Sequence, residues 1–255
     1  MLRSGVVSIT LKEKSAGELL RLAARAGLAG IEWSENYHVK AGDPAAAARL
    51  RKETESAGLG VVSYGSYFRL GTEENFGEVF KKSLFTAREL GAPAIRVWAG
   101  NKSSADVSGD EFNRIVRESA AIADMAAEFG IRVAYEWHGN TLTDTNESAM
   151  KLLGAVNNRN ICCLWQPSSH LDEAARLEGL GLLKDKLLNI HTYYWADRQR
   201  RPLVEGKDAW KEYFRLIDRT QDHYLLMEFV KGDSQEQFLE DAAVLKDWIK
   251  DYNQA

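Results

Sequence analysis

One short stretch shows how this chain is built: Gly130-Ile131-Arg132-Val133-Ala134-Tyr135-Glu136. A helical pattern ends at the glycine, and an apolar run rich in β-branched residues follows at once. Glycine suits the left-handed residue just past a helix C-terminus, so the chain enters a strand directly. The same junction occurs at Gly27, Gly58 and Gly91. The repeating unit is therefore a helix, a glycine and a strand.

Extended in both directions, this pattern predicts eight strands. They are expected at 6–10, 28–33, 59–64, 94–98, 131–136, 161–165, 187–192 and 224–229. Three helical segments begin with a hydroxyl three residues before Glu or Gln, at Ser15, Ser108 and Ser234, which is the spacing of a capping box. Eight near-continuous apolar strands alternating with helices indicate α/β architecture, a single (β/α)8 barrel over residues 1–255. A doubly wound open sheet is the structural alternative.

The composition is that of a globular protein, because 45% of the residues are hydrophobic and only 4 are proline. With 33 basic and 37 acidic residues the net charge is −4, which disfavours a nucleic-acid partner. Cys162 and Cys163 are adjacent in an apolar run, where a bridge between them would be strained, so we expect buried, reduced thiols. The chain has no signal-peptide pattern and no run of about 18 apolar residues. We therefore expect a cytoplasmic protein that makes no membrane contact.

Four consecutive strands end in polar side chains, where the chemistry of such a barrel lies. These are Glu136, Gln166, His191 and Glu228, separated by 30, 25 and 37 residues. Each gap is about one strand–helix unit, so the four side chains can converge at one height. Two carboxylates, an amide oxygen and an imidazole suit Mn²⁺, Mg²⁺, Co²⁺ or Zn²⁺, so the pattern predicts one catalytic divalent metal ion. The alternative is that both glutamates face the outer helices and pair with basic residues.

Aromatic and basic residues near the strand ends are candidates for substrate recognition. A stacking wall for a sugar is expected from Trp33, Trp98, Trp137, Trp165, Tyr193, Tyr194 and Trp195. Arg96 in the fourth strand, and Arg198 and Arg201 after the seventh, can hold a hydroxyl, carboxylate or phosphate, although the last two also suit solvated loop positions. His38 and Glu32, around the second strand, either help to close the site or make structural contacts.

Several of these motifs together resemble a known family. They are Gly30-Ile-Glu-Trp33 with His38 after it, Ser63-Tyr-Gly-Ser-Tyr67, Glu136-x-His138, His191 and Glu228. The set resembles the xylose isomerase-like TIM-barrel family of sugar phosphate isomerases and epimerases, which includes D-tagatose 3-epimerase, and the resemblance spans essentially the whole chain. It implies that Glu136, Gln166, His191 and Glu228 bind one divalent metal ion and that the two glutamates also carry protons. It also implies a homodimer or homotetramer.

With these assignments, the residues expected to contact a sugar or sugar phosphate are His38, Arg96, Trp98, His138, His170, Arg198 and Arg201. Two positions depart from the family pattern. Gln166 stands where the family has Asp, so less negative charge faces the metal and we expect weaker metal binding. Ser169 stands where the family has a histidine, and His170 follows one position later, so the substrate contact of that histidine is open.

The expected activity is metal-dependent isomerisation or epimerisation of a ketose, keto-sugar or sugar phosphate through an enediolate, with Glu136 and Glu228 exchanging the proton. Three other functions are alternatives. A keto-inositol-type dehydratase begins with the same proton abstraction and then loses a β-hydroxyl. A DNA repair barrel of the endonuclease IV type is disfavoured by the net charge and by the presence of only 5 histidines. A non-catalytic sugar-binding barrel would account for Gln166 as a lost metal ligand.

Overall fold

The glycine junctions adopt the left-handed backbone that the sequence pattern requires. In the computed structural model, which describes residues 1–254, φ is 68° at Gly27, 75° at Gly58, 72° at Gly91 and 66° at Gly130. A residue with a Cβ is strained at such angles, whereas glycine is not. Each glycine therefore turns the chain from the end of a helix into the next strand.

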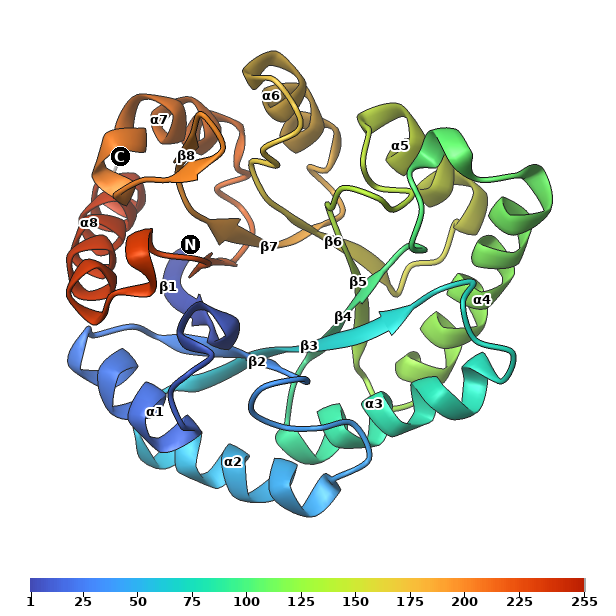
Figure 1. The fold of residues 1–255 in the computed structure, drawn as a ribbon, viewed down its shortest axis with the longest axis horizontal. Coiled ribbons are helices and arrows are strands. Elements are labelled where there is room, and N and C mark those ends of the chain that lie inside the picture. The colour runs from blue at the N-terminus through green and yellow to red at the C-terminus, as the bar shows by residue number, and fades with distance from the viewer. Residues whose placement is uncertain (255) are drawn as a thin grey trace.

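The strands that follow these junctions close into a parallel barrel (Figure 1). Its members are β1 (Leu2–Val7), β2 (Gly30–Ser34), β3 (Gly60–Arg69), β4 (Ala94–Trp98), β5 (Arg132–Glu136), β6 (Ile161–Trp165), β7 (Leu187–Thr192) and β10 (His223–Met227). Each strand pairs with its neighbours in chain order, and β1 pairs in parallel with both β2 and β10. This closure confirms the (β/α)8 barrel and rules out the open sheet.

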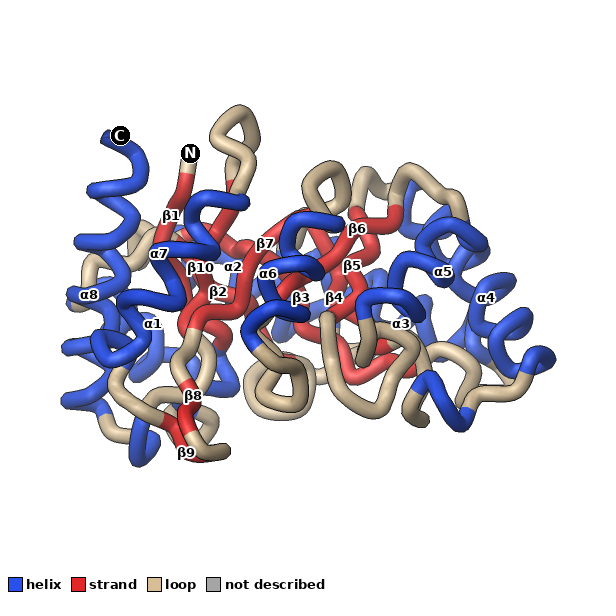
Figure 2. Tube along the Cα trace, turned by 90° about the horizontal axis from the view of Figure 1, so that it is seen from above, coloured by secondary structure: helices blue, strands red, loops and turns tan. Residues whose placement is uncertain are grey.

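Within residues 1–254, eight α-helices surround the barrel. They are α1 (Ala16–Arg25), α2 (Pro44–Ser56), α3 (Phe76–Leu90), α4 (Gly109–Ala127), α5 (Asn146–Val156), α6 (Glu173–Leu182), α7 (Lys207–Leu216) and α8 (Gln235–Gln254). A small antiparallel hairpin, β8 (Trp195–Ala196) and β9 (Gln199–Arg200), follows β7. In Figure 2 the hairpin lies on the side of the barrel opposite the N-terminus, where the strands end. No helix in residues 1–254 combines the length and the apolar character that a membrane crossing requires.

Some element boundaries differ from those expected. The first strand covers Leu2–Val7 rather than 6–10, because Ser8–Leu11 forms a 3₁₀ turn. The third strand continues to Arg69, five residues past its expected end. The capping boxes at Ser15 and Ser108 are complete. At Ser234 only half of the box forms, because the Gln237 side chain donates to Asp241 (2.9 Å) instead of turning back to the helix start.

Alternation along the strands separates two apolar layers. One layer packs strands against helices and contains most of the large buried side chains. The other fills the barrel in two small clusters, around Val7, Val62 and Leu226 and around Ala134, Cys162 and Leu164. The second cysteine, Cys163, faces the helices, and both thiols are free and buried, as expected. Because the interior clusters are small, the remaining inward positions are available for polar side chains.

Candidate active site

The four strand ends bring their polar side chains together, as the sequence spacing predicts. Glu136 ends β5 and His191 lies in β7, whereas Gln166 and Glu228 directly follow β6 and β10. All four side chains are buried. Ligand atoms of Glu136, His191 and Glu228 lie within 4.8 Å of one another. The glutamates therefore face the barrel interior rather than the outer helices.

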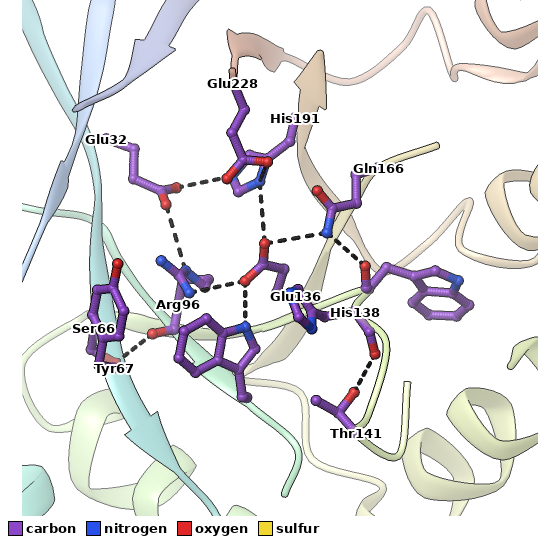
Figure 3. A network of polar contacts seen from close by, with 12 residues as sticks. Glu32, Ser66, Tyr67, Arg96, Glu136, His138, Thr141, Gln166, His191 and Glu228 are labelled. Carbon is purple, nitrogen blue, oxygen red and sulfur yellow. Dashed lines mark hydrogen bonds and ion pairs between the residues drawn. The ribbon is translucent and has the colours of Figure 1, made fainter. Parts of the chain in front are cut away.

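Glu136 is held by hydrogen bonds from three side chains (Figure 3). Its Oε2 accepts from a guanidinium nitrogen of Arg96 at 2.9 Å and from Trp98 Nε1 at 2.5 Å. Its Oε1 accepts from Gln166 Nε2 at 3.3 Å. Burial alone would raise the pKa of Glu136, but the charges of Arg96 and His191 outweigh it and lower that pKa. Glu136 is therefore a fixed, ionised carboxylate.

His191 is fully buried between carboxylates on both sides of its ring. Its Nε2 lies 3.4 Å from Glu32 Oε2, and its Nδ1 lies 3.6 Å from Glu136 Oε1 and 3.4 Å from Glu228 Oε2. Burial disfavours the imidazolium, but the charges of Glu228 and Glu32 outweigh it and raise the pKa of His191. Nδ1 has no hydrogen-bond partner, so it is the nitrogen available to a ligand between the two glutamates.

Glu32 anchors this group from deeper in the barrel. It accepts a hydrogen bond from Ser63 Oγ at 2.6 Å and lies 3.6 Å from Arg96 Nε. A Cβ at Gly65 would stand 2.8 Å from Glu32 Oε1 and 3.0 Å from a guanidinium nitrogen of Arg96, so the pair needs glycine there. Of the two roles open for Glu32, the structure shows the ion pair. A carboxylate that approaches one histidine nitrogen fixes the tautomer and leaves the other nitrogen free for a metal.

Gln166 is oriented by the main chain of the neighbouring strand. Its Nε2 donates to the carbonyl oxygen of Trp137 at 2.9 Å, and because a carbonyl can only accept, this atom must be the amide nitrogen. The side-chain oxygen consequently points toward His191 and Glu228, as Figure 3 shows. Gln166 can therefore offer an oxygen to the same group, but without a charge.

A cavity of about 420 Å³ opens above these residues. Its walls combine aromatic rings with polar groups: Ile9, Tyr67, Arg96, Trp98, Glu136, His138, Gly139, Asn140, Gln166, Ser168, Ser169, His170, Tyr193, Trp195, Glu228 and Phe229. Of the aromatic wall expected from the sequence, only three rings are among these residues, Trp98, Tyr193 and Trp195. Trp33, Trp137 and Trp165 lie in the outer core instead.

The candidate substrate residues divide into two groups. Arg96, Trp98, His138 and His170 line the cavity, whereas His38, Arg198 and Arg201 do not. His38 Nε2 lies 3.1 Å from the carbonyl oxygen of Lys14, and its ring packs edge-on against Trp33. Arg198 is exposed at the turn of the β8–β9 hairpin, and the backbone nitrogen of Arg201 donates to the carbonyl of Tyr194.

The charges and donor atoms of the site fit a divalent cation. Three buried carboxylates, Glu32, Glu136 and Glu228, face one guanidinium, that of Arg96, so two negative charges are uncompensated when His191 is neutral. Buried charge of this kind is costly unless it is paired or bound to a metal. Two carboxylates, the free imidazole nitrogen and the Gln166 oxygen form a mixed O/N donor set, the type that binds Mn²⁺, Co²⁺ or Zn²⁺.

A family model described as xylose isomerase-like TIM barrel matches residues 20–248. The chain belongs to this family. Over 106 residues, which are 40% of this chain and 38% of the relative, it is 42% identical to a 3-dehydroshikimate dehydratase of Bacillus anthracis. The match thus spans well under half of that curated relative.

Two solved structures share the whole fold. The probable 3-DHS dehydratase from Bacillus anthracis superimposes with a TM-score of 0.81 at 22% identity, covering 96% of this chain and 99% of its own. A D-psicose 3-epimerase superimposes with a TM-score of 0.74 at 17% identity, covering 99% of this chain and 100% of its own. At these identities the likeness establishes the fold alone.

Proposed function

We propose that this family member is a divalent-metal-dependent enzyme that removes the proton from the carbon next to the carbonyl group of a small hydroxylated ketone. The observation that carries this proposal is the cluster of Glu136, His191 and Glu228, in which the unpartnered His191 Nδ1 lies between two carboxylates that line the cavity. A divalent ion bound there would act as a Lewis acid on the substrate carbonyl and make the neighbouring C–H more acidic.

The surroundings of the two glutamates assign them different tasks. Glu136 is held by Arg96, Trp98 and Gln166, which keeps it ionised and makes it a weak base. Glu228 borders the same cavity, and of residues 1–254 only His191 approaches its carboxylate as a charged partner. We therefore assign proton removal to Glu228, in addition to its place in the metal donor set, and assign Glu136 to holding the metal only.

With Glu228 as the only base, the site favours dehydration, which needs one base, over epimerisation, which needs two. After Glu228 takes the proton, the electron pair of the C–H bond forms a C=C bond and the β-hydroxyl leaves as water with a proton from an acid. Two histidines line the cavity and are the candidates for this acid. Each has one ring nitrogen that donates to a carbonyl oxygen, His138 Nδ1 to Gly139 at 2.7 Å and His170 Nε2 to Asp144 at 2.8 Å, so the other nitrogen carries the proton for the leaving hydroxyl when the ring is an imidazolium. The likeness to 3-dehydroshikimate dehydratase of Bacillus anthracis, in sequence and in structure, supports this outcome.

Epimerisation of a ketose is the second candidate. It is supported by the presence of two carboxylates at one cavity and by the structural likeness to D-psicose 3-epimerase. This reaction requires Glu136 to return a proton although Arg96 and Trp98 hold its Oε2. The dehydratase needs no such change, so it is our first choice.

Two substrates distinguish these reactions. The Mn²⁺-loaded protein is incubated with 3-dehydroshikimate, whose loss of water gives an aromatic ring detected by ultraviolet absorbance, and separately with D-fructose and D-psicose in deuterated water. We expect the aromatic product, and we expect Glu228→Gln to abolish it. Deuterium incorporation into a ketose without loss of water would favour the epimerase. If neither compound reacts and no α-proton exchanges in either, the proposed proton abstraction is contradicted for these substrate classes.

A further inference from the structure

One cation next to the cavity has no ion-pair partner within residues 1–254. Arg96 is already paired with Glu32 and Glu136. Arg69, the last residue of β3, does not line the cavity itself, but it lies over the ring of Trp98, which does. The side chain of Arg69 lies against Trp98, and the ring of Trp98 also contacts Tyr67 edge-on and lies beneath the guanidinium of Arg96.

The guanidinium of Arg69 lies over an aromatic ring rather than in an ion pair with a residue of 1–254. Its central carbon lies 4.1 Å from the ring centre of Trp98, a cavity wall residue that donates to Glu136. Its only hydrogen bond to residues 1–254 is a long one, 3.5 Å, to the carbonyl of Gly100, and no carboxylate of these residues lies within 4.0 Å of it. A half-buried charge without a counter-ion is unfavourable unless a ligand supplies one.

A second cavity adjoins the first one. It measures about 280 Å³, and Tyr67 lines both cavities. Arg69 and Lys82 line the second cavity together with Glu35 and Glu73, and neither carboxylate forms an ion pair with Arg69. Figure 3 shows Tyr67 beside Arg96 at the edge of the polar cluster. A substrate substituent that extends from the cluster toward Arg69 would pass Trp98 and Tyr67.

We propose that Arg69 binds a carboxylate group of the substrate and so selects keto acids over neutral ketoses. This inference rests on the proposed function and extends it by naming the substrate class. A guanidinium stacked on an indole ring keeps its edge free for a planar, bidentate carboxylate. A carboxylate would add one negative charge to a cavity that already holds Glu35 and Glu73, whereas a phosphate dianion would add two.

The test compares one molecule with and without its charge. Binding of 3-dehydroshikimate and of its methyl ester is measured by isothermal titration calorimetry with the Mn²⁺-loaded protein. Wild type is compared with Arg69→Met, which keeps the apolar stem, with Arg69→Lys, which keeps the charge, and with Arg198→Met as the control. Thermal melting checks that each variant is folded.

Arg69→Met should weaken binding of the acid by about 10- to 100-fold, the effect of losing a charged hydrogen bond, and should leave binding of the ester unchanged. Arg69→Lys should fall between wild type and Arg69→Met, and Arg198→Met should match wild type. The proposal is contradicted if acid and ester lose affinity equally, if Arg69→Met binds the acid like wild type, or if wild type binds no acid. If the acid binds through Arg69 but no α-proton exchanges, the proposed function fails and this inference stands. If wild type exchanges the α-proton of the ester as well as that of the acid, the proposed function stands and only this inference fails.

Discussion

The two glutamates of the cluster lie at one cavity but are held in different ways. The carboxylate of Glu136 is fixed directly, by Arg96, Trp98 and Gln166. Glu228 is fixed through its backbone instead, since Thr10 Oγ1 donates to the carbonyl of Met227 at 3.0 Å and accepts from the nitrogen of Phe229 at 3.3 Å.

The residue after Glu228 reinforces this contrast. Phe229 has φ 57°, a conformation that is strained for an aromatic residue and persists where the surroundings enforce it. The backbone turn aims the Glu228 side chain into the cavity while its carboxylate stays free of strong donors. The comparison teaches that one site can hold a permanently charged ligand and a usable base of the same residue type, because only the environments differ.

The largest expected effect concerns the free carboxylate. Glu228→Gln removes the base, so the rate of α-proton exchange should fall by about 10²- to 10⁴-fold, the usual contribution of general base catalysis. The free energy of unfolding should fall only slightly, because the charged partner of this carboxylate within residues 1–254 is His191, at 3.4 Å. Exchange is measured by mass spectrometry in deuterated water and stability by urea titration, with Glu236→Gln as the control. Wild-type exchange in Glu228→Gln would remove the assigned difference between the glutamates.

The second effect concerns Arg96, which holds the carboxylate of Glu136. Arg96→Met leaves Glu32 and Glu136 buried without their cation, so the unfolding free energy should fall by about 3–5 kcal/mol. Burial raises the pKa of Glu136 and Arg96 lowers it, with the lowering dominant. The stabilisation is therefore fully present above the ordinary glutamate pKa of about 4.3, begins to decrease below it, and is lost as the pH falls through the lowered pKa of Glu136 in the folded protein. Urea titrations at pH 7 and pH 4 should show a smaller difference at pH 4, and an equal loss at both values would contradict the ion-pair account.

A third, smaller effect tests whether Glu32 orients the His191 ring for metal binding. Glu32→Gln removes the charge that faces His191 Nε2, so Mn²⁺ affinity should fall by about 10- to 100-fold, as for other groups that orient a metal ligand. Glu35→Gln is the matched control, because Glu35 lies outside the cluster and accepts from the backbone of Tyr67. Unchanged Mn²⁺ affinity in Glu32→Gln would show that Glu32 does not orient the ring.

The smallest effect concerns the neutral ligand beside Glu136. Gln166→Asp adds a negative charge to the donor set, so Mn²⁺ affinity should rise, on the order of tenfold. Asp has no amide N–H, so this variant also loses the hydrogen bond to Glu136, whose carboxylate is then held by fewer donors. Gln166→Ala should weaken binding instead. If both variants bind Mn²⁺ like wild type, Gln166 is not part of the metal site.

The sequence predicts the barrel and the convergence of its strand ends because both depend on regular spacing. Side-chain direction was harder to assign. Trp33, Trp137 and Trp165 are adjacent to Glu32, Glu136 and Gln166, and neighbours in a strand face opposite sides, so both members of a pair cannot line the cavity. Arg69 lies past the expected end of its strand, and nothing in the sequence indicates that β3 continues five residues further. The boundaries of the first strand were also mispredicted, because an apolar run does not specify where strand pairing stops and the Ser8–Leu11 turn begins.

The most direct test of the central claim is a Mn²⁺ titration of the chelator-treated protein, with free metal followed by electron paramagnetic resonance, for wild type and for His191→Ala and Glu228→Ala. The account predicts one saturable site per chain in wild type and its loss in both variants. Equal binding in all three proteins, or no binding in wild type, would contradict a metal centre formed by Glu136, His191 and Glu228.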